Sequence, residues 1–457
     1  MRRNRSTASE AADRSPRRPR RIQVLRTLDQ MSSGTRWRTG LGISAALAVL
    51  LAVTMLMRAS QNMAQTTFPL VAGDLLHLNA TAVGAVAAAG GGVSVLAMVV
   101  LASRIPPRRV PLVLVASLLM LGLAFPLVAV AHSVAVLTVA VLLLGFAGGL
   151  VFPTLITAVG GIAGEDAARG TRDRPIALLG VALSASLAIG PFIETAILAV
   201  SGGDLRSAFL WFTLGPLVAA LLMVGVVTRR SAWNRARQAD RRQARADAEG
   251  RGGAASEATT KAGGSVARPR GRVSLRRALD DPAFQVALLG QLLYAAPFTA
   301  LIVFGALLAR HGYGLSPAEI QVAFGVFFVV SFGVRAGMAW RSPIRHKLAW
   351  FRVSTGLTLG GLVVVGLGHG DLQLLLAMAL LGVPHGLTFP LSMALVAEDR
   401  THAELPSINA HLTASVQAVN LVLPLFLGLG IDAVGFRKTF LILLIPVAAA
   451  GAAQHLV

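Results

Sequence analysis

Long apolar runs recur along the whole chain, separated by shorter polar stretches. An α-helix needs about 20 mainly apolar residues to cross the hydrocarbon core of a bilayer, and the runs have about this length. We therefore predict an all-α integral membrane protein with twelve transmembrane helices. The expected spans are residues 41–68, 80–102, 109–131, 134–161, 175–200, 206–228, 284–309, 318–340, 349–368, 372–396, 408–431 and 439–456.

The composition agrees with a membrane protein. The chain has 457 residues, of which 54% are hydrophobic and only 14% are charged, and its mean hydropathy is +0.68. These values exclude an ordinary soluble protein of this size. The chain has no cysteine, which excludes disulfides and thiolate metal sites.

Most of the net charge of +21 lies in two stretches. Residues 1–38 contain 11 Arg against 3 acidic residues, and residues 229–280 contain 14 Arg or Lys against 5. Both have too few apolar residues to fold, so we expect a disordered N-terminal tail and a disordered linker. No aromatic residues alternate with the arginines, so we expect no nucleic-acid partner and place these stretches beside anionic lipid.

The short connections alternate in charge. Those at 103–109, 168–175 and 341–347 are basic, whereas those at 73–82, 131–133 and 368–371 contain no Arg or Lys. Because arginine and lysine accumulate in cytoplasmic loops, the alternation predicts that both termini are cytoplasmic. We expect a multi-pass protein of the bacterial-type cytoplasmic (inner) membrane.

The two halves of the chain share a sequence pattern. Residues 144–153 read LGFAGGLVFP and residues 381–390 read LGVPHGLTFP, so six of ten positions are identical. A second repeat places GDLRSAFL at 203–210 against VGFRKTFL at 434–441. These repeats predict two related six-helix bundles, residues 39–228 and 281–457, joined by the basic linker.

Six plus six spans, the charged central linker and the repeat resemble the major facilitator superfamily over essentially residues 39–456. The stretch PLVAGDL at 69–75 also resembles the end of that family's first helix. The stretch ASRIPPRR departs from the family pattern, since it lacks the usual glycines and aspartate between the second and third helices. The resemblance implies a secondary transporter that works by alternating access, with a central cavity lined by the first, fourth, seventh and tenth helices.

The first span carries a polar stripe. Its members are spaced so that they share one face of a helix. They are Thr54, Arg58, Gln61, Asn62 and Gln65. A charge near the bilayer centre costs about 2.5 to 3.5 kcal/mol on insertion scales, so it normally faces protein or water. We expect the stripe to line a substrate cavity; the alternative is that it only packs against neighbouring helices.

Arg58 needs a counter-charge, and the fifth span contains one acidic residue, Glu194. Measured from the centres of their helices, Arg58 lies about 5 Å and Glu194 about 9 Å toward the same side. We therefore expect these residues to interact and Glu194 to gain and lose a proton during transport. A static ion pair that fixes helix packing is the alternative.

The stretch from Ala177 to Thr195 resembles the fifth-helix motif of drug and proton antiporters. It keeps Gly190 and Pro191 but has Glu194 and Thr195 where that motif has glycines. Small residues permit close helix contact and proline weakens the local hydrogen-bond ladder, so Gly190 and Pro191 are expected to serve conformational change. The resemblance favours efflux.

Further candidates lie in the second half. His385, near the centre of the tenth span, could relay protons or bind substrate, or could be a neutral histidine bonded to a nearby carbonyl. Arg335 is expected to direct its charge toward the cytoplasmic surface. The candidate hydrogen-bonding groups, which could equally link helices, are Gln291, Tyr294, Gln417 and Asn420.

No nucleotide-binding loop and no His-Glu-x-x-His metal motif is present, so we expect neither an enzyme nor a primary pump. The sequence predicts a monomeric secondary transporter that exports a small apolar or amphipathic molecule, with the proton gradient as energy source and no cofactor. One alternative is uptake of a small organic anion held by Arg58; the absence of a matching arginine on the seventh span, where Tyr294 stands, counts against it. Another is a membrane receptor or scaffold that transports nothing.

Overall fold

A computed structural model of the chain describes residues 45–106, 109–167, 174–226, 273–341, 344–398, 400 and 404–456. By its contacts, Val49–Val457 forms one compact unit. The predicted tail and most of the predicted linker lie outside the described residues. The last residues of that linker are folded, because Val273 and Ala278 are buried in a hydrophobic cluster with Phe284.

The described residues before 227 form six spans. They are α2 (Ala45–Leu70) with the π-type turn η1 (Val71–Leu75), α3 (Ala80–Leu96) with η2 (Ala97–Leu101) and η3 (Ala102–Arg104), α4 (Val110–Ala129), α5 (Val134–Ala167), α6 (Arg174–Val200), and α7 (Leu205–Phe212), whose span continues to Val226.

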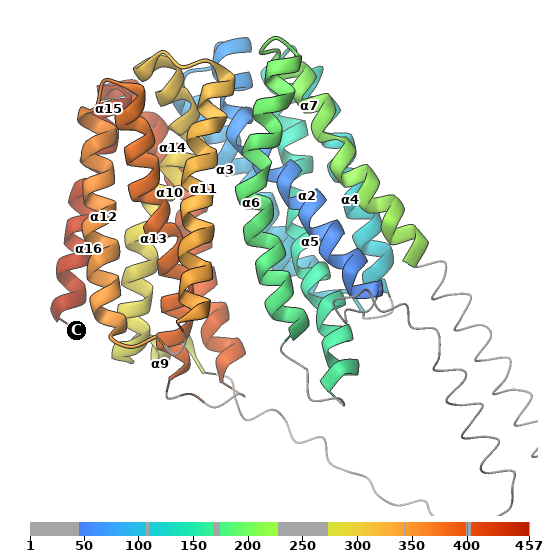
Figure 1. Cartoon of the computed structure of the whole chain (residues 1–457), viewed down its shortest axis with the longest axis vertical. Coiled ribbons are helices and arrows are strands. Elements are labelled where there is room, and N and C mark those ends of the chain that lie inside the picture. Colours follow the sequence, from blue (N-terminus) through green and yellow to red (C-terminus); the bar gives the residue numbers. More distant parts are fainter. Residues whose placement is uncertain are drawn as a thin grey trace, which may run out of the picture. The chain divides into compact units, whose positions relative to one another are not determined.

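The described residues from 273 onward form six more spans after one short helix. The short helix is α9 (Leu275–Leu279), and the spans are α10 (Pro282–Tyr313), α11 (Pro317–Trp340), α12 (Lys347–Leu367), α13 (Asp371–Ala397), α14 (Leu405–Val434), and α15 (Phe436–Ile442) with α16 (Leu444–Leu456). The prediction of an all-α protein with twelve membrane-spanning helices is thus confirmed for the described part. Figure 1 shows α2–α7, in blue to green, standing together and α9–α16, in yellow to red, standing together.

Several helices begin at residues whose side chains bind the free amides of the first turn. The Asn79 side chain accepts a hydrogen bond from the amide of Ala82 at the start of α3. Ser316 and Glu319 form a reciprocal capping box at the start of α11. Such caps stabilise a helix end by about 1 kcal/mol, and they fix where these spans begin.

The repeated sequence brings helices into close contact in both halves. A side chain at Gly145 of α5 would lie 2.1 Å from the carbonyl oxygen of Gly90 on α3. A side chain at the matching Gly382 of α13 would lie 2.5 Å from the carbonyl oxygen of Phe327 on α11. Glycine therefore permits equivalent backbone approaches in the two halves, which explains why the motif recurs.

The halves contact each other mainly through two helix pairs, α3 with α14 and α6 with α11. In the first pair, Gly84 faces the carbonyl of Pro424, and Gly428 faces the carbonyl of Ala80. In the second pair, the ring of Phe192 lies against Gly325. Glycine thus allows α3 and α14 to approach to backbone distance, and Gly325 leaves room for the Phe192 ring between α6 and α11.

The two ends of the bundle differ in their connections. The connections at 76–79, 130–133, 201–204, 314–316 and 368–370 contain no Arg or Lys, and we call their side the neutral-loop end. The connections at 105–109 and 341–346 contain arginine, and we call their side the basic-loop end.

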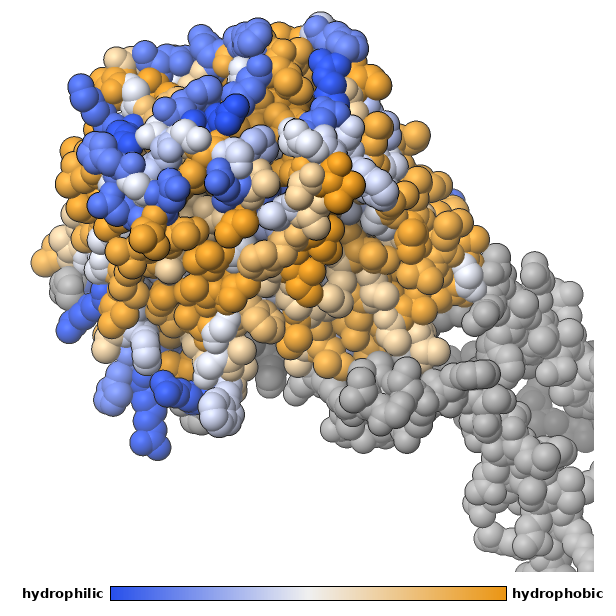
Figure 2. Space-filling model, turned by 45° about the horizontal axis from the view of Figure 1, so that its top comes forward, coloured by the Kyte–Doolittle hydropathy of each residue, from blue (hydrophilic) through white to orange (hydrophobic). Residues whose placement is uncertain are grey.

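Large apolar side chains cover the sides of the bundle between its ends. Leu123, Leu221 and Ile445 are each about 70% exposed. On the face drawn in Figure 2, hydrophilic residues gather toward the top and bottom and hydrophobic residues cover the surface between them. This distribution is the one expected of a surface that contacts lipid.

Candidate functional site

Glu194 is fully buried near the neutral-loop end of α6. Its carboxyl group accepts a hydrogen bond from the hydroxyl of Thr67 and lies 3.5 Å from the hydroxyl of Thr66, both on α2. Both threonines are also fully buried. The described residues offer this carboxyl group no ion-pair partner. A carboxylate buried without a cation is costly, so these surroundings favour the neutral acid.

Gln321 connects this carboxyl site to the other half of the protein. It lies on α11, is fully buried, and donates from Nε2 to the hydroxyl of Thr67 at 3.2 Å. Its Oε1 accepts from the hydroxyl of Thr66 at 3.1 Å. The four side chains therefore form one polar cluster, which we call the carboxyl cluster: Thr66, Thr67, Glu194 and Gln321.

The expected pair between Arg58 and Glu194 does not form in the described structure. The first span extends seven residues past its predicted end at residue 68, to Leu75, so its centre lies closer to Arg58 than predicted. Glu194 instead faces Thr66, which is eight residues, or about 12 Å, further along α2. The prediction was wrong because η1 carries the span past Asp74, whose charge was assigned to the following loop.

The polar stripe on α2 has several environments. Thr54 and Asn62 are buried; the Thr54 hydroxyl donates to the carbonyl of Leu50, and the Asn62 amide donates to the carbonyl of Leu187 on α6. Arg58 and Gln61 are partly accessible and Gln65 is exposed. The stripe is therefore part helix contact and part accessible face. Its role in lining a substrate cavity stays a prediction.

Arg335 does not point toward the surface as predicted. Its guanidinium donates to the carbonyl of His385 on α13 at 3.1 Å and to the hydroxyl of Ser184 on α6 at 3.2 Å. It therefore bridges the halves near the middle of the bundle. Arg58 lies close enough for the two guanidinium groups to repel each other. The guanidinium points inward because two hydrogen-bond acceptors lie there, the His385 carbonyl and the Ser184 hydroxyl.

His385 lies in a cluster of rings. Its ring centroid is 4.7 Å from that of Phe298, 5.1 Å from that of Phe327 and 5.6 Å from that of Tyr294. Its Nδ1 lies 2.7 Å from the hydroxyl of Ser331. The expected alternative of a histidine bonded to a carbonyl is replaced by a bond to a hydroxyl. We call His385 and the three rings the aromatic cluster.

The remaining hydrogen-bonding candidates fall into two groups. Gln291 and Tyr294 are each 7% exposed, and the Gln291 Nε2 and the Tyr294 hydroxyl have no hydrogen-bond partner among the described residues. Asn420 accepts from the hydroxyl of Thr299 at 2.8 Å and donates to Gln417 at 3.1 Å. The second group links α10 to α14, whereas the first leaves buried donors unused.

Gly190 and Pro191 lie where α6 meets α2. A side chain at Gly190 would lie 3.2 Å from the carbonyl of Ala59 and 3.6 Å from the Asn62 amide. Pro191 is buried inside α6, three residues before Glu194. Gly190 thus allows close contact with α2, and Pro191 removes a backbone hydrogen bond of α6 about one turn before Glu194. The role of these two residues in conformational change stays a prediction.

Charged groups join the halves at the neutral-loop end. Asp74 of η1 lies 3.4 Å from Arg310 Nε and 3.1 Å from His311 Nε2, both on α10. Asp432 of α14 accepts hydrogen bonds from the amides of Ala80 and Thr81 at 3.0 and 2.9 Å. A carboxylate of one half therefore caps a helix of the other.

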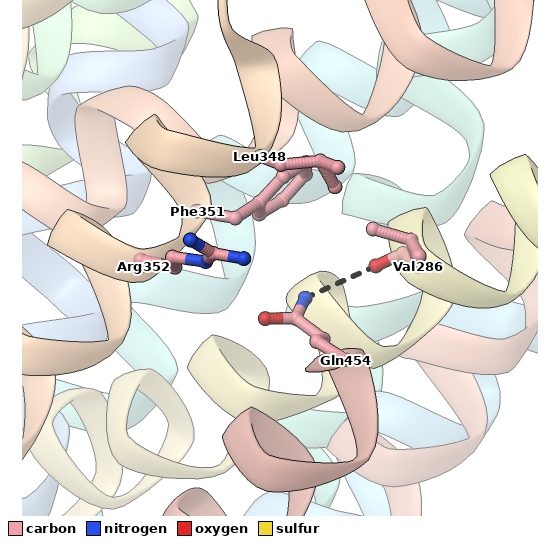
Figure 3. Close-up of a pocket in the computed structure, with 5 residues that line it drawn as sticks. All are labelled: Val286, Leu348, Phe351, Arg352 and Gln454. Atoms are coloured by element: carbon pink, nitrogen blue, oxygen red, sulfur yellow. Dashed lines mark hydrogen bonds between the residues drawn. The ribbon is translucent and has the colours of Figure 1, made fainter. Parts of the chain in front are cut away.

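A small pocket lies apart from these groups, inside the second half (Figure 3). Leu348, Phe351 and Arg352 of α12 line it, with Val286 of α10 and Gln454 of α16. The Gln454 amide donates to the carbonyl of Val286 at 3.1 Å, which ties α16 to α10. The pocket belongs to packing within one bundle. The described residues contain no group of three His, Cys, Asp or Glu that could hold a metal ion.

Sequence reasoning missed Thr66, Thr67, Gln321 and the inward direction of Arg335. Thr66 continues the polar stripe of α2, twelve residues after Thr54, and was read as the end of the span. Gln321 lies only five residues into α11, where a polar side chain suggests a helix end. In both places the first sign of a site was a polar residue inside a membrane span, and only the first span is markedly longer than expected.

The chain matches the family model of the Major Facilitator Superfamily over residues 3–171 and 50–399. No curated protein sequence matches it. The fold is similar to that of the nucleoside transporter NupG, with TM-score 0.63, 11% identity and coverage of 90% of this chain and 99% of that one. It is also similar to a bacterial homologue of the human lysosomal transporter Spinster in an inward-facing conformation, with TM-score 0.64, 12% identity and coverage of 90% of this chain and 96% of that one. For the peptide transporter POT the TM-score is 0.64 and the identity 14%, with coverage of 93% of this chain and 97% of that one. At these identities the likeness shows a shared fold.

Proposed function

Because this chain belongs to the major facilitator superfamily, we propose that it is a proton-coupled secondary transporter that exports a small amphipathic molecule by alternating access. One observation carries the proton coupling. Glu194 is buried without a cation in the carboxyl cluster, whose members come from both halves. A titratable group at the junction of two moving bodies can exchange a proton when they separate.

The carboxyl cluster gives the coupling a physical route. While the halves are joined at the neutral-loop end, Gln321 and the two threonines surround Glu194 and exclude water. Separation of α6 from α11 removes Gln321 and lets water reach the carboxyl group. Hydration stabilises the charged form, so the acid exchanges its proton with the neutral-loop side in that state. Coupling requires the opposite exchange in the state that opens at the basic-loop end, so that each cycle carries one proton across.

Export is supported by the resemblance of Ala177 to Thr195 to the fifth-helix motif of drug and proton antiporters. An amphipathic substrate is supported by the aromatic cluster, which offers apolar surface beside the polar atoms of Arg335. The proposal places a monomer in a bacterial-type inner membrane with both termini cytoplasmic. The proton gradient is its energy source, and it needs no cofactor and performs no catalysis.

Transport by reconstituted protein tests this proposal. Liposomes that hold the protein are given a pH gradient of either sign, and the movement of dyes, drugs and organic anions is followed together with internal pH. Glu194→Gln should abolish movement driven by the pH gradient while leaving exchange of substrate down its own gradient. Glu319→Gln is a matched control, because Glu319 is an exposed carboxyl whose capping bond glutamine can replace.

The outcomes separate the proposal from its rivals. Retention of gradient-driven transport by Glu194→Gln would exclude Glu194 as the proton site. Accumulation of substrate inside rather than export would reverse the direction. A receptor or scaffold predicts no flux of any compound in either direction, so a flux that depends on the protein excludes it.

A further inference from the structure

Two guanidinium groups from opposite halves lie near each other in the middle of the bundle. Arg58 comes from α2 and Arg335 from α11, and His385 lies within electrostatic range of both. Neither arginine forms an ion pair with a carboxylate of the described residues. The buried acid Glu194 of α6 contacts α2 at Thr66, about 12 Å along that helix from Arg58. The positive charge is therefore uncompensated, which is costly inside a membrane protein.

Unused hydrogen-bond donors occur in the same region. Arg335 Nε, the Tyr294 hydroxyl and Gln291 Nε2 are buried and have no partner among the described residues. The neutral hydroxyl of Tyr294 lies within electrostatic range of the Arg335 guanidinium, and the Tyr294 ring centroid is 5.6 Å from that of His385. Gln291 is three residues before Tyr294, on the same face of α10. Buried donors are rarely left unpaired, so several donors beside two cations indicate a missing acceptor that carries negative charge.

We infer that Arg58 and Arg335, with Tyr294 and Gln291, bind the oxyanion group of the transported molecule, a carboxylate or a phosphate ester on an apolar body. The aromatic cluster provides the apolar contact, since Phe298 is stacked at 4.7 Å on His385. Arg58 is partly accessible, so its side chain is not sealed in the core. This inference rests on one part of the proposed function, that the protein transports a molecule, and does not depend on proton coupling.

The placement has a consequence for coupling. Gln321 and Arg335 lie fourteen residues apart on α11, about four turns, and so share one side of that helix. One helix therefore touches both the carboxyl cluster and the anion site. Proton and anion occupy separate places, and movement of α11 connects them. Direct competition of substrate with the proton for Glu194 is not needed.

Thermal unfolding of the purified full-length protein in detergent tests the anion site without any gradient. The probes are inorganic phosphate and acetate, with chloride at matched ionic strength as the control for screening. A saturable rise in unfolding temperature is expected with at least one oxyanion, because a ligand that binds only the folded state stabilises it by mass action. Phenyl phosphate and benzoate should act at lower concentration than benzamide, and comparing them separates phosphate from carboxylate.

Variants assign the effect to the site. Arg58→Gln and Arg335→Gln should each weaken the apparent affinity for the oxyanion at least tenfold, whereas Arg352→Gln, in the pocket of Figure 3, should leave it within twofold. If either arginine variant fails to fold, Tyr294→Phe, which removes only a hydroxyl, should weaken affinity severalfold. Absence of a saturable shift, equal affinity for benzamide, or unchanged affinity in the site variants overturns the inference. Loss of proton coupling in Glu194→Gln with intact anion binding would leave it standing.

Discussion

Gln321 of α11 donates its amide hydrogen to the hydroxyl of Thr67 on α2 at 3.2 Å, which joins the two halves directly beside Glu194. Both residues are fully buried, and the same Thr67 hydroxyl donates a hydrogen bond to the carboxyl group of Glu194. It makes the protonation of Glu194 and the contact between the halves parts of one polar cluster.

Replacing Gln321 by leucine should loosen the neutral-loop end. The change keeps the side chain's bulk but leaves the hydroxyls of Thr66 and Thr67 without their amide partner, which costs about 1–3 kcal/mol in the closed state. Spin labels at Leu75 and His369, on different halves, should show a longer mean distance; the absence of native cysteine makes the labelling specific. Gln285→Leu, which changes an amide bonded within the second half, should leave that distance unchanged. An unaltered distance in Gln321→Leu would mean that the bond does not hold the halves together.

Replacing Asp432 by alanine should also weaken closure. Its carboxylate caps α3 from the other half through the amides of Ala80 and Thr81. Loss of a cap costs about 0.5–2 kcal/mol, and here the loss falls on the closed state alone. The same spin-label pair should report a larger open fraction, with Asp371→Ala, at the start of α13, as the control. Equal distance distributions in the two variants would contradict a role for the cap in closure.

The repeated glycines should be intolerant of alanine in both halves. A side chain at Gly145 would lie 2.1 Å from a backbone oxygen, and one at Gly386 would lie 2.7 Å from the carbonyl of Ser331. Each substitution should lower stability by about 1–3 kcal/mol, measured as reduced unfolding temperature in detergent. Gly360→Ala is the control, since nothing lies within 4 Å of the added carbon and alanine favours a helix. Similar unfolding temperatures for Gly145→Ala and Gly360→Ala would refute the close approach.

Asp204 should make stability depend on acid pH. It caps α7 outside the membrane-spanning segment, and hydrogen bonds from Ser207, chiefly from its hydroxyl, lower the pKa of this carboxyl. A lowered pKa gives stabilisation that is complete above the ordinary value of about 3.9 and is lost as pH falls through the lower folded-state value. The unfolding temperature of wild type should therefore exceed that of Asp204→Asn by a constant amount above about pH 5, and the gap should shrink below about pH 4. A gap that stays constant down to acid pH would exclude the linkage.

The sequence was sufficient for the architecture, because apolar length alone marks a membrane span and the described helices reproduce all twelve. The repeated glycines were visible as a motif, and their physical reason became clear only when Gly145 and Gly382 were found against backbone carbonyls. Periodicity gives the face of a helix but not its depth in the bundle.

The candidate site could be predicted only in part. Glu194 was found because an acid inside a span is rare, but its partner was misassigned. The π-type turn at Val71–Leu75 extends the first span, which changes the depth of Arg58 relative to the centre of that span. Arg335 was predicted to point to the surface, but its direction is set by Ser184 and His385. These residues are 151 and 50 positions away in the sequence. Such tertiary contacts leave no signal in one sequence.

The most direct test of the account is the protonation state of Glu194 in the folded protein. Infrared difference spectroscopy of the purified protein near neutral pH detects the carbonyl stretch of a protonated carboxylic acid. Such a band is expected in wild type and in Glu319→Gln. It should be lost in Glu194→Gln and should decrease when Gln321→Leu opens the neutral-loop end to water. Identical spectra for wild type and Glu194→Gln in this region would contradict it.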